Sequence, residues 1–447
     1  MRIPLNGMAG VACVVLSVLL GAALALEARA EEAAPAAAEA SDSERIEELE
    51  EKVDILTDEV GRLEAIFVVP EELQLVSVNG LGPAASKVYK RDSGLSIGGY
   101  GEVRLRSYFN QEDDDQDQML DALRAVLYVG YKFNDNWVIN SETEFEHGGA
   151  EVATEFLTID YLWRDEANLR AGLVLVPMGF VNEIHEPNFY FGAERPEIER
   201  TILPSTWREV GAGVFGRIAD RVEYRAYVIN GFDGRGFTSS GLRGGRQGGS
   251  EALANDVAFV GRVDVDVLSG LEVGGSVYVG QSGQEQDFDA DGAGPNPARS
   301  LPDAQTTVYE LHLQYKRYGA SLRGLWTEAF IDEAGRLSRV LGKGTTSSVA
   351  QHMRGWYVEA AYDVMPLLHR ETRMSLEPYF RFEKYDTQED VSDLTFARDE
   401  SKDVDLYVAG IQFKPIPQIV FKVDYRHFDP EDGHRAEQIQ GLVGYVF

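Results

Sequence analysis

Charged side chains gather in residues 177–209 of this 447-residue chain, among prolines and large apolar groups. Carboxylates and guanidiniums spaced this closely either pair with each other or present fixed charges to a passing ion or solute. Apolar groups such as Phe189, Tyr190 and Trp207 have little use in a solvated loop, so we expect the stretch to fold against a wall and keep its shape. The candidates for lining a constriction are Arg195, Arg200, Arg208, Glu194, Glu197 and Glu199. The alternative is that these charges pair with one another and fasten the stretch to that wall.

Segments with a period of two residues surround this stretch, from Ser93 to Phe447. One of them, residues 137–146, has Glu142, Glu144 and Glu146 in a row on one face, which can face water but not a dry core. About sixteen such segments can be counted, an even number as single-chain bacterial barrels require. The pattern predicts an all-β transmembrane barrel of about 16 antiparallel strands; a soluble sandwich or propeller would need a packed core. The lumen-facing candidates are Arg104, Arg106, Arg124, Lys132, Glu142, Glu144, Arg262, Asp264, Arg323 and Arg381.

The final segment of the chain supports a closed barrel. Ile439, Gly441, Val443, Tyr445 and Phe447 alternate with the residues between them. A strand with no following element must pair with a sheet that is already present, and pairing with the first strand provides this. A terminal Phe behind alternating apolar residues also looks like the signal that bacterial outer-membrane barrels present to their assembly machinery.

The first thirty residues have the features of a secretory signal peptide. A positive start precedes the apolar run Val11–Leu26 and an Ala-x-Ala site at residues 28–30, so we expect cleavage after Ala30. A transmembrane anchor needs about 20 strongly apolar residues, more than this run has. The single cysteine, Cys13, lies inside the run, so the mature chain has no thiol for a disulfide or for catalysis.

Residues 31–92 are expected to form a periplasmic spacer, a coiled coil and a linker. An apolar heptad pattern runs through the middle of this segment. Its core positions are Ile46, Leu49, Val53, Leu56, Val60 and Leu63. β-Branched residues at a and Leu at d favour two strands, and a lone amphipathic helix on another surface is the alternative. Residues 93–447 form the predicted barrel domain.

Composition narrows the choice of partners. The formal net charge is −32, which disfavours nucleic acid. The mean hydropathy of −0.24 is compatible with strands that face lipid on one side and water on the other. Outer-membrane lipid is therefore the expected surrounding.

Several local motifs do not amount to a chemical site. Residues 287–292 match the first half of a calcium loop, but Ala298 stands where the final acid belongs. The seven histidines lack zinc-ligand spacing, and Arg243-Gly244-Gly245-Arg246 lacks the strand–loop–helix context of a phosphate cradle. Ser205 and His185 occur in one loop, as a hydrolase could use, yet such pairs arise by chance. We expect no cofactor, no metal and no enzymatic activity.

Leu173–Gly216 contains Val176-Pro177-Met178-Gly179, Glu194-Arg195-Pro196 and the run from Pro204 to Gly216. This stretch, with Gly98–Glu102 and the terminal Phe, resembles the phosphate-selective porin O/P family of Gram-negative outer-membrane porins. The resemblance implies a 16-stranded trimeric porin whose third long loop folds inward. That family's selectivity rests on a ladder of basic residues, and no such ladder can be matched here.

The mixed charges of the lumen candidates favour a water-filled channel in the outer membrane for passive diffusion of ions and small hydrophilic solutes. One alternative is an anion- or phosphate-selective channel. Another is a structural barrel that tethers the outer membrane to the cell wall through its coiled coil. The expected partners are outer-membrane lipid, the barrel assembly machinery and two further copies of the chain.

Overall fold

The computed structural model describes residues 49–57, 75–109, 118–287, 300–369, 372–391 and 395–447. The chain divides into two compact units, residues 1–65 and 66–447. In the first unit residues 49–57 are helical, and Leu49, Val53 and Leu56 are exposed. Ile46, Val60 and Leu63 lie outside the described residues, so the coiled coil stays a prediction. Among the described residues, no helix is both long and apolar enough to cross a membrane.

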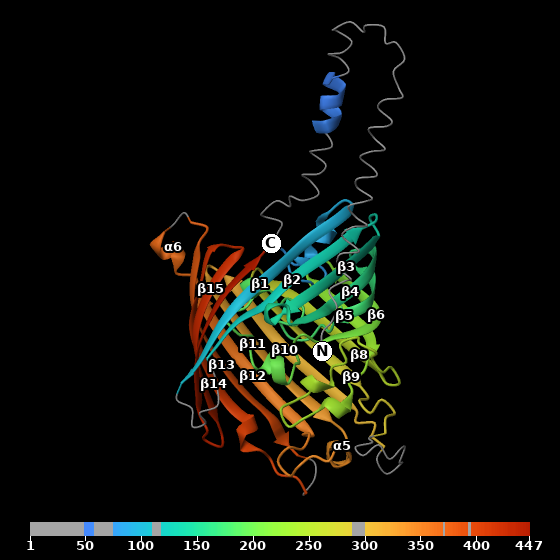
Figure 1. Ribbon diagram of the computed structural model, residues 1–447, viewed down its shortest axis with the longest axis vertical. Helices are drawn as coiled ribbons and strands as arrows, with labels where there is room; N and C mark the ends of the chain where they lie inside the picture. The colour runs from blue at the N-terminus through green and yellow to red at the C-terminus, as the bar shows by residue number, and fades with distance from the viewer. Residues whose placement is uncertain (1–48, 58–74, 110–117, 288–299, 370–371, 392–394) are drawn as a thin grey trace, which may run out of the picture. The chain divides into compact units, whose positions relative to one another are not determined.

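Sixteen antiparallel strands close into a single transmembrane barrel in the second unit, which confirms the fold and the strand count predicted from the alternating pattern (Figure 1). Each strand pairs with its neighbours in the chain. The strands are β1 (Gly94–Phe109), β2 (Met119–Lys132), β3 (Trp137–Glu146), β4 (Glu151–Arg164), β5 (Ala167–Leu175), β6 (Arg208–Ile218), β7 (Val222–Asn230), β8 (Val257–Leu268), β9 (Leu271–Gly280), β10 (Thr306–Arg317), β11 (Ala320–Ile331), β12 (His352–Tyr362), β13 (Ser375–Asp390), β14 (Asp403–Ile416), β15 (Ile419–Pro430) and β16 (Ala436–Val446).

Short helical turns interrupt the connections between strands. They are η1 (Ala85–Lys90), η2 (His147–Gly149), η3 (Pro187–Phe189), α4 (Ile198–Thr201), η4 (Gly234–Gly236), η5 (Arg243–Gly245), α5 (Ala334–Val340), α6 (Met365–Leu368) and η7 (Glu400–Lys402). One end of the barrel carries mostly tight turns, such as Tyr318-Gly319 between β10 and β11. Both residues have positive φ, +55° and +81°, as a two-residue hairpin turn with the twist of its strands requires.

The barrel closes where β1 pairs with β16. The Phe447 N–H donates to the Gly99 carbonyl oxygen at 2.8 Å, and the Gly99 N–H donates to the Phe447 carbonyl oxygen at 2.9 Å. The expected pairing of the last segment with the first is thereby confirmed. Among the strands that the structure describes, no edge is left open, as a hydrocarbon environment demands.

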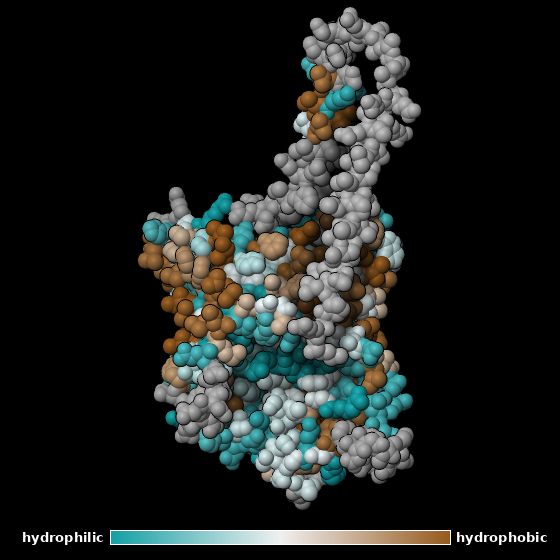
Figure 2. Space-filling view, in the orientation of Figure 1, coloured by the Kyte–Doolittle hydropathy of each residue, from teal (hydrophilic) through white to brown (hydrophobic). Residues whose placement is uncertain are grey.

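The two faces of the wall differ as the period of two predicts. Outward residues such as Leu105, Val129, Leu311 and Val423 are large, apolar and exposed. Figure 2 shows hydrophobic residues over the sides of the barrel and hydrophilic ones around the end that carries the long loops. Inward positions are largely polar and charged. The outer face can therefore meet lipid tails while the inner face needs water or polar partners.

Residues 75–92, where the sequence predicts a linker, belong to the same compact unit as the barrel. Their apolar side chains pack on inward residues of the wall, including Tyr100, Tyr128 and Phe156. The segment therefore lies inside the barrel and not beyond it. The segment contains only one short helix, η1, which is too short to give the local sequence a recognisable apolar period.

Candidate functional site

Residues 176–207, called the inner loop from here on, join β5 to β6. The side chain of Asn182 links the two ends of this loop. Asn182 Nδ2 donates to the carbonyl oxygens of Val176 at 2.7 Å and Trp207 at 2.8 Å, and the Trp207 N–H donates to Asn182 Oδ1 at 2.8 Å. The buried Trp207 ring stacks on Phe232 with 4.5 Å between centroids. The loop leaves the wall as a shaped unit, as its prolines and apolar groups predicted.

The inner loop crosses the lumen to the strands opposite its own. Arg381 Nη1 on β13 donates to the Phe191 carbonyl oxygen at 3.1 Å, and Lys422 Nζ on β15 donates to the Tyr190 carbonyl oxygen at 2.7 Å. In the ring of sixteen strands, β13 stands diametrically opposite β5. A loop rooted at β5 and β6 can reach these partners only through the interior.

Glu199 fastens one side of the inner loop. Its Oε2 accepts hydrogen bonds from the Phe180 N–H at 2.7 Å and the Val181 N–H at 2.8 Å, and its Oε1 accepts from the Tyr357 hydroxyl at 2.7 Å. Burial raises the pKa of Glu199, and these hydrogen bonds partly oppose the shift. The carboxylate therefore joins two parts of the loop to β12.

Glu194 and Glu197 fasten the loop to two further strands. Glu194 pairs with Arg104 at 2.9 Å and Arg106 at 2.6 Å, both on β1. Glu197 pairs with Arg426 of β15 at 2.8 Å. Burial disfavours the charge of Glu194, but Arg104, Arg426 and Arg106 outweigh it and hold the pKa of this carboxyl below its usual range. The two glutamates therefore remain charged and hold the loop against the wall.

An outer cavity of about 410 Å³ lies between the inner loop and the long-loop ends of β1 to β4. Arg208 pairs with Glu155 across it at 2.6 Å, and Arg124 pairs with Glu102 at 2.8 Å. The charged residues that line it are Glu102, Arg104, Arg124, Glu144, Glu146, Glu151, Glu155, Glu194, Arg195, Arg200, Arg208, Arg243 and Arg246. The cavity thus presents both signs of charge.

Three of these arginines have no carboxylate partner among the described residues. Arg195 is buried, and its Nη2 has no hydrogen-bond partner there. Arg243 Nη1 donates to the Ser205 carbonyl oxygen at 2.7 Å, and Arg246 Nη1 donates to the Thr206 carbonyl oxygen at 2.8 Å. Burial and the adjacent Arg246 lower the pKa of Arg243 to about 9. Positive charge is therefore crowded at this side of the cavity.

An inner cavity of about 600 Å³ lies on the other side of the inner loop, toward the short turns. Among the described residues, Tyr190 alone lines both cavities. Its side chain is buried, its hydroxyl donates to Glu102 Oε2 at 3.2 Å, and Lys422 Nζ lies 3.9 Å from its ring centroid. Tyr190 therefore stands where the two cavities meet.

The predicted constriction residues have different positions. Arg195, Arg200, Arg208 and Glu194 line the outer cavity, whereas Glu197 and Glu199 are buried in anchoring contacts.

The predicted lumen-facing residues occupy the inward rows of their strands. Glu142 contacts His185 of the inner loop at 3.0 Å, and Arg323 donates to the Phe189 carbonyl oxygen at 2.9 Å. Arg381 holds Glu359 and Glu383, while Lys132 is half-buried near the short-turn end of β2. Sequence reasoning missed Tyr190 as a lining residue and set Arg243 and Arg246 aside, because no local spacing shows which loops meet.

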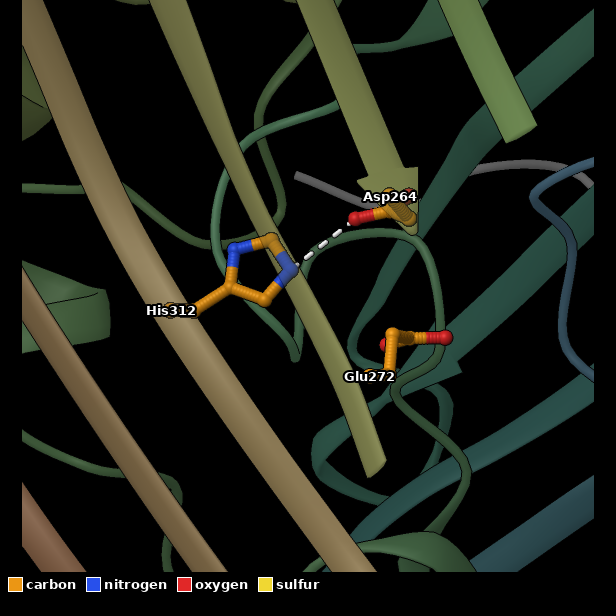
Figure 3. Close-up of side chains that lie close together, drawn as sticks. All are labelled: Asp264, Glu272 and His312. Carbon is orange, nitrogen blue, oxygen red and sulfur yellow. Dashed lines mark hydrogen bonds and ion pairs between the residues drawn. The ribbon is translucent and has the colours of Figure 1, made fainter. Parts of the chain in front are cut away.

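Asp264, Glu272 and His312, from three adjacent strands, bring ligand-type atoms within 4.8 Å of one another (Figure 3). His312 Nε2 lies 2.9 Å from Asp264 Oδ1, and His312 Nδ1 lies 2.9 Å from Glu310 Oε2. Asp264 also pairs with Arg262 at 2.9 Å and with Arg225. Two guanidiniums already neutralise this carboxylate, so the donor set fits an ion-pair network better than a divalent cation.

No known family model matches the chain. An uncharacterized protein of Aquifex aeolicus (strain VF5) is 34% identical to it over 401 residues, which are 86% of this chain and 87% of that protein.

Several solved structures share the fold. The outer membrane channel DcaP of Acinetobacter baumannii has a TM-score of 0.52 at 11% identity, covering 79% of this chain and 97% of its own. Salmonella typhi OmpF has a TM-score of 0.52 at 13% identity, covering 80% and 98%. An anion-selective porin from Comamonas acidovorans has a TM-score of 0.50 at 12% identity, covering 79% and 100%. At this identity the likeness shows the barrel fold alone.

Proposed function

The chain belongs to one family with the Aquifex aeolicus protein, and on that premise we propose that it is an outer-membrane channel for passive diffusion of ions and small hydrophilic solutes. The observation that carries the proposal is a polar lumen divided by an inward-folded loop into two charged cavities that meet at Tyr190. A barrel that served only as a scaffold could fill its interior with apolar side chains. A lumen lined by ionised groups is suited to hydrated solutes.

The charges of the outer cavity argue for weak selectivity. Carboxylates from β1, β3 and β4 face guanidiniums from β1, β2, β6 and the two neighbouring loops. Rings of one sign select ions, whereas opposed arrays give a field across the passage that admits both signs. General diffusion is therefore favoured.

The second candidate function is an anion- or phosphate-selective channel, as the resemblance to the porin O/P family implies. The support for it is local: Arg195, Arg243 and Arg246 have no carboxylate partner among the described residues and lie on one side of the outer cavity. An anion passing there would meet three uncompensated guanidiniums.

We further propose a homotrimer in the outer membrane, with the N-terminal helix in the periplasm and assembly through the strand that ends in Phe447. The exposed apolar residues of helix 49–57 support association through this helix. A periplasmic helix could also tether the barrel to the cell wall while the pore conducts.

The test is planar-bilayer conductance of the protein lacking residues 1–30, in a KCl gradient. Stepwise openings, grouped in threes, would support a trimeric pore, and the sign of the reversal potential would decide between weak selectivity and anion preference. A correctly folded barrel that never conducts would refute the channel and leave the tether as the function.

A further inference from the structure

Residues 75–92, called the inner segment from here on, fill part of the lumen near the short turns. Leu81, Ala84, Ala85 and Val88 are at most 3% exposed, and Ser86 is fully buried. The apolar side chains pack against residues of β1, β2, β4 and β16. A linker that only joined the barrel to the N-terminal helix would not need to bury its side chains in the lumen.

The wall is shaped to receive this segment. A Cβ atom added to Gly130, on the inward row of β2, would lie 2.8 Å from Val88 Cβ. One added to Gly98, on the inward row of β1, would lie 2.8 Å from the Ala84 carbonyl oxygen. Contacts this short are not tolerated between real atoms, so any larger residue at either position would displace the segment. The segment can pack against the wall at these two positions only because glycine has no Cβ atom.

Polar bonds fix the segment in that seat. Asn140 Nδ2 on β3 donates to the Ala85 carbonyl oxygen at 2.8 Å, and the Tyr89 hydroxyl donates to Asp160 Oδ2 on β4 at 2.6 Å. Arg170 Nη2 on β5 donates to the Tyr89 hydroxyl at 3.1 Å. Each of these wall residues is buried, and undocking would remove the partner of the Asn140 amide and expose the Asp160–Arg170 ion pair to the lumen.

The inner segment also touches the inner loop. The Ala84 N–H donates to Glu186 Oε1 at 3.3 Å, and Phe189 packs on the same apolar cluster as Leu81. Both elements line the inner cavity, the segment through Leu75, Ser77, Gly80 and Pro83. A solute leaving Tyr190 toward the short-turn mouth therefore passes between loop and segment.

We propose that the inner segment is a second constriction, seated on Gly98 and Gly130, which sets the solute size limit on the inner side of the channel. This rests on the proposed channel function. The outer cavity is lined by the inner loop and by Arg243 and Arg246 of the β7–β8 loop but not by the segment, whereas the inner cavity is lined by the inner loop and the segment together. Release of the segment widens only the inner half.

The first experiment replaces Gly130 by Leu, which forces Val88 out of its seat. The matched control is Gly324→Leu on β11, where an added Cβ meets nothing closer than 3.8 Å and the register partners Leu313 and Val358 face outward. In planar bilayers we expect G130L to raise both the single-channel conductance and the size of polyethylene glycol that enters the pore. G324L should match the unmodified protein in both. Equal conductance and equal size limit in G130L and G324L would overturn the proposal.

The second experiment tests docking without relying on conductance. The mature chain lacks cysteine, so Val88→Cys with Gly130→Cys introduces the only pair. Their Cβ positions, 2.8 Å apart, need a shift of only about 1 Å to reach disulfide geometry. We expect spontaneous oxidation, seen as a faster-migrating band that reductant abolishes, and a conductance no higher than that of the unmodified protein.

The two experiments distinguish failure of the docking proposal from failure of the channel proposal. A folded double-cysteine variant that stays reduced would show that the segment does not dock. A disulfide in a barrel that never conducts would refute the channel itself, and with it any role for the segment in solute size.

Discussion

Replacing Glu199 by Ala should loosen the inner loop while leaving the barrel wall intact. The carboxylate accepts three buried hydrogen bonds, two from the Phe180 and Val181 N–H groups and one from the Tyr357 hydroxyl. Alanine accepts none, so three buried donors lose their acceptor. The strands of the wall retain all their ladder bonds, because Glu199 contributes nothing to them.

The magnitude follows from those three donors. Each buried donor left without an acceptor costs about 1–3 kcal/mol. Burial also raises the pKa of Glu199, so removing the carboxylate relieves an unfavourable burial and offsets part of the loss. We expect about 3 kcal/mol in total, which corresponds to roughly a hundredfold rise in the population of the opened loop.

Trypsin provides the assay, because the Arg200–Thr201 bond lies in α4 and is protected while the loop is seated. Cleavage follows the opened population when reclosing is fast, so E199A should be cut roughly a hundredfold faster than the unmodified protein. Tyr357→Phe removes one donor and should accelerate cleavage by about tenfold or less. The reasoning fails if E199A, with the unheated gel mobility of a folded barrel, is cut at the unmodified rate.

Three further changes test the site. Tyr190→Ala should raise the single-channel conductance by joining the two cavities. Tyr190→Phe keeps the ring and should change the conductance little. Equal conductance in the two variants would show that the passage does not run past Tyr190. Burial raises the pKa of Glu186 from 4.5 to about 7, so the contribution of this group to the free energy of unfolding is greatest below pH 4.5 and falls by up to about 3 kcal/mol toward pH 7. Glu186→Gln removes this contribution, so in urea unfolding the free energy of the variant should fall less between pH 4.5 and pH 7 than that of the unmodified protein, and an unchanged slope would contradict the prediction. Glu194→Gln uncovers the guanidiniums it now neutralises, so the reversal potential in a KCl gradient should move toward chloride; movement toward potassium would be the opposite of what the geometry requires.

The strands could be predicted because each carries its own local signal. Alternation marks the two faces, and turn residues such as Asn134-Asp135-Asn136 mark the ends. The inward fold of the loop could also be predicted, since Trp207 and its apolar neighbours need a surface to pack on. Pairing of neighbouring strands then follows from chain order alone.

The partners of the loop charges could not be predicted in the same way. Glu197 and Arg426 are far apart in the chain, and only the closed barrel brings them together. Arg243 reaches Ser205 because two separate loops enter the same cavity. The inner segment was missed for a related reason: the glycines that seat it are informative only when the register of β1 and β2 is known.

The seam between β1 and β16 has a consequence for the order of folding. Adjacent strands elsewhere follow one another directly in the chain, but the two strands of the seam are separated by the other fourteen. Their pairing carries the largest loss of chain entropy and is expected to come last. Until then the wall is an open, curved sheet, so the inner loop and inner segment can settle on its concave side before the ring shuts. They are enclosed during assembly rather than inserted into a finished tube, and in a closed barrel their removal must proceed through a mouth.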